Sequence, residues 1–174
     1  MKLFVGESRL TESKPLQDLL DTLPQAGRVE WIGIRPSRGE PMIALESVQI
    51  NLDKGLEGDR FNSSIGSPRQ VTLIQQEHLN VIASCLNRGP IPPSLLRRNI
   101  VVSGINLLAL KDKFFRIGDA MLEFSGLCHP CNKMERQLGA GGYNAMRGHG
   151  GITARVREAG LVRLHDMVFY PNNK

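Results

Sequence analysis

Apolar side chains along most of this chain occur in short stretches typical of β-strands. Eight stretches are rich in Val, Ile and aromatic residues and are bounded by Pro, Gly or Asn: 28–36, 41–50, 69–75, 99–105, 114–118, 120–126, 151–158 and 166–170. Gly118 and Asp119 lie between two of them and predict a tight hairpin turn. Many short strands without strand-helix alternation predict a mainly β fold, a β-barrel with peripheral helices.

Helical spacing of leucines marks the N-terminal part of the chain. Residues 11–23 carry four leucines at this spacing, together with an early Pro15 and a possible capping residue, Thr11 or Ser13. They predict an amphipathic helix that extends the barrel at its N-terminal end.

Two further helices interrupt the strand pattern. Residues 76–89 predict a helix that ends at Gly89, because the three prolines that follow cannot continue it. Cys85 in this helix is expected to be a buried small hydrophobe. The third helix is expected to begin at about Cys131.

Length and cysteine content limit the class of protein. At 174 residues the chain fits a single domain, 1–174, and can bury a sizeable core. It has no apolar stretch of about 20 residues for a membrane span and no signal-peptide core. Three cysteines do not make a secreted disulfide framework, so we expect a cytoplasmic protein with no membrane partner.

The positive charge is concentrated in one part of the chain. Residues 97–163 contain eleven Lys or Arg against five Asp or Glu, a net +6, whereas the whole chain carries +5. Such a surplus suits an anionic ligand, most simply a phosphate. No nucleic-acid partner is expected, because six Phe, two Tyr and one Trp provide no stacking-rich segment among the basic residues.

Cys128 and Cys131 form a C-x-x-C pair between a predicted strand and a predicted helix. Structural zinc needs four ligands, and Cys85, His78, His149 and His165 do not lie at partner spacing. A thioredoxin-like dithiol fits the local order, but no parallel βαβ unit precedes the pair. The third possibility is a single thiolate that acts as ligand or nucleophile beside an anionic partner.

Glycines and arginines near this pair favour the third possibility. Residues 139–151 contain six of the 18 glycines, which allow a close backbone approach or positive φ angles. The residues that flank this loop or lie in turns at strand ends are Arg147, Arg155, Asp59, Arg60, Arg97, Arg98 and Asn99. Guanidinium groups in such positions suit a phosphate.

Five ordered motifs resemble a known family. They are GLEGDRF at 55, RQVTLI at 69, RRNIVVSGINL at 97, FRIGDAMLEFSGLCHPCNKME at 115 and GHGGITARV at 148. Together they resemble the MOSC domain, named for the C-terminal part of molybdenum cofactor sulfurases and also found as stand-alone bacterial proteins. The resemblance covers residues 30–168 and implies a closed barrel of the pyruvate-kinase-barrel type.

The resemblance also implies a site. The functional cysteine of the family follows the proline directly, which is Cys131 here, and Cys128 is an additional cysteine that would permit a disulfide. Cys131 would ligate molybdenum, with Asp59 or Asn99 orienting substrate or pterin. The expected residues around molybdopterin, the molybdenum cofactor, are Arg60, Arg97, Arg98, Arg147, Gly150, Gly151 and Arg155.

Two functions are compatible with this site. One is reduction of small N-hydroxylated substrates at a Cys-ligated molybdenum centre, with electrons from a redox partner protein. The other is non-catalytic carriage of the cofactor or of persulfide sulfur on Cys131, with a cysteine desulfurase as partner.

Overall fold

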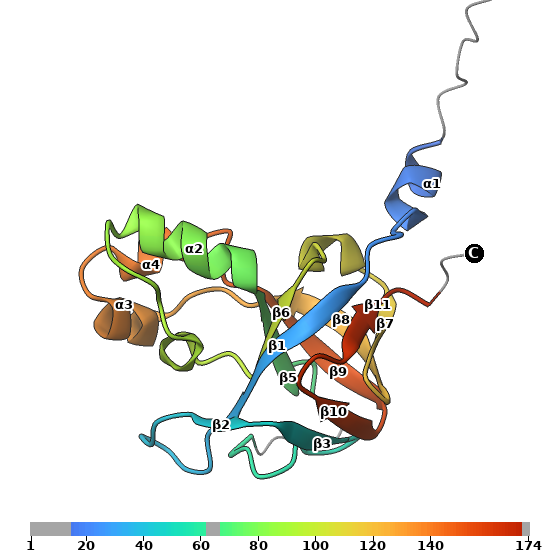
Figure 1. Ribbon diagram of the computed structural model, residues 1–174, viewed down its shortest axis with the longest axis horizontal. Coiled ribbons are helices and arrows are strands. Elements are labelled where there is room, and N and C mark those ends of the chain that lie inside the picture. The colour runs from blue at the N-terminus through green and yellow to red at the C-terminus, as the bar shows by residue number, and fades with distance from the viewer. Residues whose placement is uncertain (1–14, 62–66, 172–174) are drawn as a thin grey trace, which may run out of the picture.

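The computed structural model describes residues 15–61 and 67–171, and seven of its strands close into a barrel (Figure 1). They are β1 (Gly27–Ile34), β5 (Val71–Gln75), β6 (Ile100–Ser103), β7 (Phe114–Ile117), β8 (Ala120–Leu127), β9 (Ile152–Glu158) and β11 (Met167–Phe169). Their order around the barrel is β11-β7-β8-β9-β5-β6-β1, and the pairing of β1 with β11 closes it. The prediction of a mainly β barrel is confirmed.

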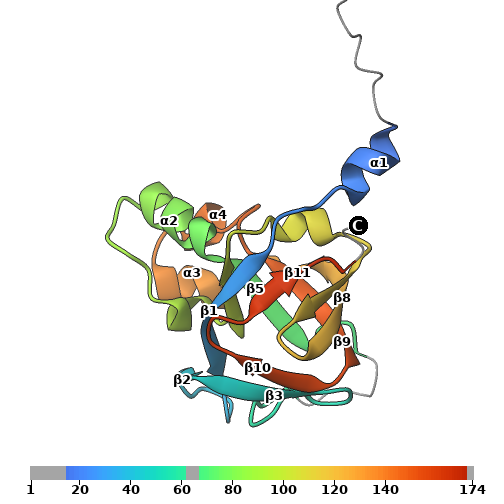
Figure 2. The ribbon, with the colours of Figure 1, turned by 45° about the vertical axis from the view of Figure 1, so that its right-hand side comes forward.

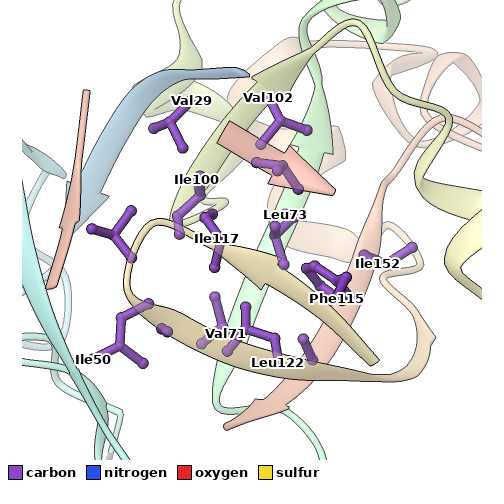
Figure 3. Packing of buried hydrophobic residues seen from close by; sticks show 14 of the residues in the cluster. Val29, Ile50, Val71, Leu73, Ile100, Val102, Phe115, Ile117, Leu122 and Ile152 are labelled. Carbon is purple, nitrogen blue, oxygen red and sulfur yellow. The ribbon is translucent and has the colours of Figure 1, made fainter. Parts of the chain in front are cut away.

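Apolar side chains from every strand fill the barrel interior (Figure 3). Val29, Leu73, Phe115 and Ile117 have no solvent-exposed surface. Burial of each such side chain stabilises the fold by about 1.5–3 kcal/mol relative to exposure. The interior is therefore a packed core, and ligand sites lie outside it.

The predicted strand 41–50 is in fact two strands in different sheets. β2 (Ile43–Leu45) continues the barrel sheet beside β1, whereas β3 (Ser47–Asn51) lies between β4 (Gly55–Leu56) and β10 (Gly160–Arg163) in a separate sheet. The chain changes sheet at Glu46, which is a bend. β4 and β10 were not expected from the sequence, because two and four residues carry little pattern.

Helices gather at one side of the barrel (Figures 1 and 2). They are α2 (Gln76–Cys85), α3 (Asn132–Leu138), α4 (Gly142–Ala145) and the 3-10 helix η1 (Pro93–Leu96), while a second 3-10 helix, η2 (Leu107–Leu110), lies between β6 and β7. Ile82, Leu96 and Met134 belong to a second apolar cluster between these helices and the barrel. β5 and β6 are parallel, so α2 and η1 form the crossover that such a pair requires.

Two further sequence predictions concern Cys85 and the turn at Gly118 and Asp119. Cys85 is exposed, so its predicted burial is wrong. It lies in the last turn of α2, and the buried side of this helix runs through Leu79, Ile82 and Ala83 instead. The Gly118-Asp119 turn is confirmed, because Ile117 pairs with Ala120 across a two-residue connection.

The N-terminal helix α1 (Leu16–Asp21) is shorter than the predicted segment 11–23, and Thr11 and Ser13 lie outside the described residues. It projects away from the barrel (Figure 2), and none of its own residues is buried. Leu23, just beyond its end, is buried, and Asp21 pairs with Lys113. In the described part of the chain, no helix is both long and apolar enough to cross a bilayer.

Candidate functional site

Asn99 directly precedes β6 and joins β1, β5 and the segment that contains Asp59. Its side-chain amide donates to Asp59 Oδ2 at 2.8 Å and to the Gly33 carbonyl at 3.3 Å. Its Oδ1 accepts from Thr72 Oγ1 at 2.7 Å and from Thr72 N at 3.2 Å. All four bonds available to this amide are therefore made to protein groups. Asn99 is only 6% exposed, which suits a positioning role better than contact with substrate.

Asp59 holds the neighbouring turn through the same network. Besides Asn99, its carboxylate accepts from Phe61 N at 3.0 Å and from Arg35 N at 3.3 Å. Arg60 N donates to the Arg35 carbonyl at 2.7 Å. These bonds fix the backbone from which Arg60 and Arg35 extend their side chains.

A cavity of about 390 Å³ is lined by basic side chains from four distant segments. Its lining residues are Arg38, Gly39, Arg60, Arg97, Lys133, Arg136 and Gln137. Five of these seven are cationic and none is acidic. We call this the cation cavity. Arg60 directly follows Asp59, and Arg97 directly precedes Arg98. The side chains of Asp59 and Arg98 are both held by hydrogen bonds.

The cations of the cation cavity have no ion-pair partner among the described residues. Seven ion pairs occur among the described residues, and none of them includes a cation of this cavity. Arg136 makes one long hydrogen bond, to the Asn132 carbonyl at 3.4 Å. Like charges that face one cavity repel one another, so an anion bound there would relieve an existing repulsion.

Arg98 has a different environment from its neighbour Arg97. It is 5% exposed and donates to three backbone carbonyls, those of Gly150 at 2.8 Å, Leu96 at 2.9 Å and Cys128 at 3.0 Å. The guanidinium group thus joins η1, the cysteine loop and the glycine-rich loop. In this structure Arg98 organises the site and does not line the cation cavity.

The two cysteines of the C-x-x-C pair differ in exposure. Cys128 is 5% exposed, and Cys131 is exposed at the N-cap of α3. α3 is also the helix that carries Lys133 and Arg136 into the cation cavity. Burial lowers the pKa of Arg98, and the nearby Cys128 and Cys131 thiol groups oppose this change. A buried cation therefore lies within electrostatic range of both sulfur atoms.

Gly150 and Gly151 are needed for backbone packing within the protein. A Cβ atom at Gly150 would collide with the Cys128 carbonyl oxygen, and one at Gly151 with the Leu73 carbonyl oxygen. Gly151 also has a φ of +83°, which L side chains rarely adopt. Gly150 is therefore explained by close contact with the cysteine loop, and Gly151 by close contact with β5.

Other residues predicted for the site lie outside the cation cavity. Arg155 on β9 pairs with Glu123 at 3.5 Å, and Arg147 is exposed after α4. His149 packs edge to face against His78, with ring centroids 5.0 Å apart. Burial lowers the pKa of His78, and repulsion from His149 lowers it further. Neither arginine lines the cavity that Arg60 and Arg97 share.

Three cations of the cavity were missed in the sequence. They are Arg38, Lys133 and Arg136. Lys133 and Arg136 are three positions apart, so they lie on one face of α3, and this spacing was a usable signal. Arg38 lies in a turn between β1 and β2, where its sequence neighbourhood shows nothing distinctive.

Comparison with known proteins identifies the family of this chain. The family model described as the MOSC domain matches residues 60–169. The chain belongs to the MOSC domain family. MOSC domains are associated with the molybdenum cofactor, and the matched region contains Cys131 and four of the five cations of the cavity.

Solved structures show the same fold at low sequence identity. YuaD from Bacillus subtilis is 22% identical with a TM-score of 0.71, covering 82% of this chain and 94% of that chain. YiiM from Geobacillus stearothermophilus is 15% identical with a TM-score of 0.68, covering 83% and 74%. YiiM from Escherichia coli is 20% identical with a TM-score of 0.63, covering 82% and 69%. The MOSC barrel is thereby confirmed, and no curated protein matches in sequence.

Proposed function

We propose that this MOSC protein binds molybdopterin in the cation cavity and reduces N-hydroxylated compounds at a molybdenum centre ligated by Cys131. One observation carries the proposal: an exposed cysteine begins the same helix that brings two cations into a cavity of unpaired positive charge. Family membership supports the choice of cofactor.

The residues present fit such a group. Molybdopterin ends in a phosphate, for which Arg60, Arg97 and Lys133 provide donors that have no competing carboxylate in the cavity. A thiolate at Cys131 is a suitable soft ligand for the metal. When bound, the cofactor would supply the redox chemistry and an open position for the oxygen atom of the substrate.

The remaining residues of the site hold its cations and the cysteine loop in position. Asn99 and Asp59 fix the turn that presents Arg60, and Arg98 fixes the backbone on both sides of the cysteine loop. In this proposal Asn99 and Asp59 orient the pterin indirectly, through the turn that presents Arg60. Gly150 and Gly151 allow close backbone contacts beside the site, whereas Arg147 and Arg155 lie outside the cation cavity. The electrons come from a redox partner protein.

The experiment is to compare molybdenum and pterin content after expression in a host that makes the cofactor. Cys131→Ser should lose molybdenum, while Cys85→Ser, an exposed cysteine on α2, should retain it. Reductase activity with a chemically reduced dye as electron donor should be lost with the metal. Equal molybdenum content and equal activity in the Cys131→Ser variant and wild-type protein would reject the proposal.

A second function is supported by the exposure of Cys131. An exposed thiol is accessible to a partner enzyme such as a cysteine desulfurase, so it could carry persulfide sulfur without any catalysis of its own. Mass spectrometry of the intact protein distinguishes the two functions. One added sulfur atom on Cys131 with no pterin would favour the carrier, and bound pterin with molybdenum would favour the enzyme.

A further inference from the structure

A second, smaller cavity adjoins the cation cavity. It has a volume of about 110 Å³ and shares Arg97 and Gln137 with its neighbour. Its other lining residues are Arg35, Glu40, Pro41, Met42, Ser94 and Leu95. The two cavities therefore lie side by side, one lined mainly by cations and the other by a mixture of apolar and polar side chains.

Arg35 indicates that negative charge also belongs near the second cavity. Its side chain is half-buried, and its Nε atom is buried without a hydrogen-bond partner among the described residues. Burial lowers the pKa of this guanidinium and repulsion from Arg97 lowers it further, while the nearby Asp59 carboxylate opposes this change. A buried donor without a partner is costly, so a bound acceptor would stabilise this arrangement.

The amount of positive charge exceeds what one phosphate needs. A phosphomonoester carries about −1.5 to −2 at neutral pH. The two cavities together present six cations and a single carboxylate, that of Glu40. Such a surplus matches a ligand with more than one phosphate group, or a phosphate with a further anionic group beside it.

The second cavity has the side chains that a nucleobase would require. Met42 and Leu95 offer apolar surface for a flat ring, while Glu40 and Ser94 can pair with its polar edge. An exocyclic amino group is the natural donor to the Glu40 carboxylate. Glu40 would thus recognise the base, whereas a site for phosphate alone has no use for a carboxylate.

We infer that the two adjacent cavities together bind a nucleoside phosphate, with its phosphates in the cation cavity and its base in the second cavity. This inference rests on the proposed function, because it places the ligand at the same site. The nucleotide has two sources: it is either the second half of a dinucleotide form of the cofactor or a separate ligand.

Calorimetry on full-length protein made in a host without the cofactor tests the inference. The probes are AMP, CMP, GMP and GDP, compared with guanosine and inorganic pyrophosphate at one ionic strength. We expect at least one nucleotide to bind about tenfold or more tightly than both guanosine and pyrophosphate, a difference of about 1.4 kcal/mol. Nucleotides that bind no more tightly than pyrophosphate would overturn it.

Two variants of equal charge change make this test specific. Arg35→Gln should weaken nucleotide binding about tenfold or more, because it removes the cation between base and phosphate. Arg163→Gln removes an exposed arginine that is paired with Asp119 on the barrel and should leave binding unchanged. Near-ultraviolet circular dichroism confirms folding of both variants. Equal weakening by the two substitutions would also overturn the inference.

The cofactor-loaded protein distinguishes the two sources. Release of one nucleotide for each molybdenum on denaturation would identify a dinucleotide cofactor. Release of none, with free nucleotide bound by the cofactor-free protein, would identify a separate ligand that competes with the cofactor for the cation cavity. If molybdenum is bound and depends on Cys131 but neither result is obtained, the nucleotide inference fails while the proposed function stands.

Discussion

The buried guanidinium of Arg98 donates to the Cys128 carbonyl at 3.0 Å. The same guanidinium donates from Nε to the Gly150 carbonyl oxygen at 2.8 Å. A side chain at Gly150 would collide with the Cys128 carbonyl. The cysteine loop is therefore fixed by one buried cation and by the close approach of a glycine. The position of Cys131, three residues later, follows from these contacts.

Replacement of Arg98 should destabilise the fold strongly. Arg98→Met leaves three buried carbonyl oxygens without their donor, and we expect a loss of about 3 kcal/mol or more in the free energy of unfolding. Arg97→Met is the matched control, because Arg97 has no such bonds and should change stability by less than about 1 kcal/mol. Denaturant unfolding measures both. Equal effects would contradict the assignment of Arg98 as the organising residue.

The Asn99–Asp59 bond gives a prediction about charge. Asn99→Asp places a second carboxylate against Asp59, where Asn99 Nδ2 now lies 2.8 Å from its oxygen. Two such carboxylates cannot both ionise without repulsion, so one is expected to have a raised pKa. The variant should be less stable than wild type at pH 7 and should recover part of the difference at pH 5.

Thermal unfolding at the two pH values measures this recovery. The double variant Asp59→Asn with Asn99→Asp restores one amide and one carboxylate, and it should recover stability at pH 7. A pH-independent loss in the single variant would show that hydrogen bonds alone, without charge repulsion, explain the effect.

Much of the fold could be predicted from the sequence, because alternation and turn residues are local. The Gly118-Asp119 turn and the strands around it needed no tertiary information. β10 could not be predicted in this way, since its four residues are placed by pairing with β3 about a hundred residues earlier in the chain. Cys85 was placed wrongly because apolar character alone does not say which face of α2 is covered.

The candidate site was only partly predictable for a similar reason. Arg60 and Arg97 lie in turns at strand ends, where functional residues concentrate. The cavity, however, is closed by Arg38 and Lys133, which come from segments almost a hundred residues apart. Arg97 and Arg98 are adjacent arginines that the sequence cannot tell apart. Only the structure shows that Arg98 is buried and organises the loops, whereas Arg97 lines the cation cavity.

His78 should make stability depend on pH. Burial lowers the pKa of His78 in the folded state, so above its unfolded pKa of about 6.5 the imidazole is neutral in both states and does not reduce stability. As the pH falls below that value, the unfolded chain binds the proton more readily than the folded protein does, and stability is lost. Wild-type protein should therefore lose more stability between pH 7.5 and pH 5.5 than His78→Gln does. The midpoint of urea unfolding measures this difference. Parallel pH profiles in the two proteins would contradict it.

The three thiols should react at different rates with a maleimide. Cys85 and Cys131 are exposed and should be modified rapidly in the native protein, whereas Cys128 should react only on unfolding. Peptide mapping after timed quenching identifies each site. Rapid modification of Cys128 would show that the cysteine loop opens in solution, and slow modification of Cys131 would contradict its exposure.

Molybdenum K-edge X-ray absorption on cofactor-loaded protein counts the sulfur atoms around the metal and so tests whether Cys131 is a ligand. We predict that the Cys131→Ser protein that still holds molybdenum has one sulfur ligand fewer than wild type and than Cys85→Ser. An identical sulfur shell in all three proteins, or no molybdenum in wild type under full cofactor supply, would contradict it.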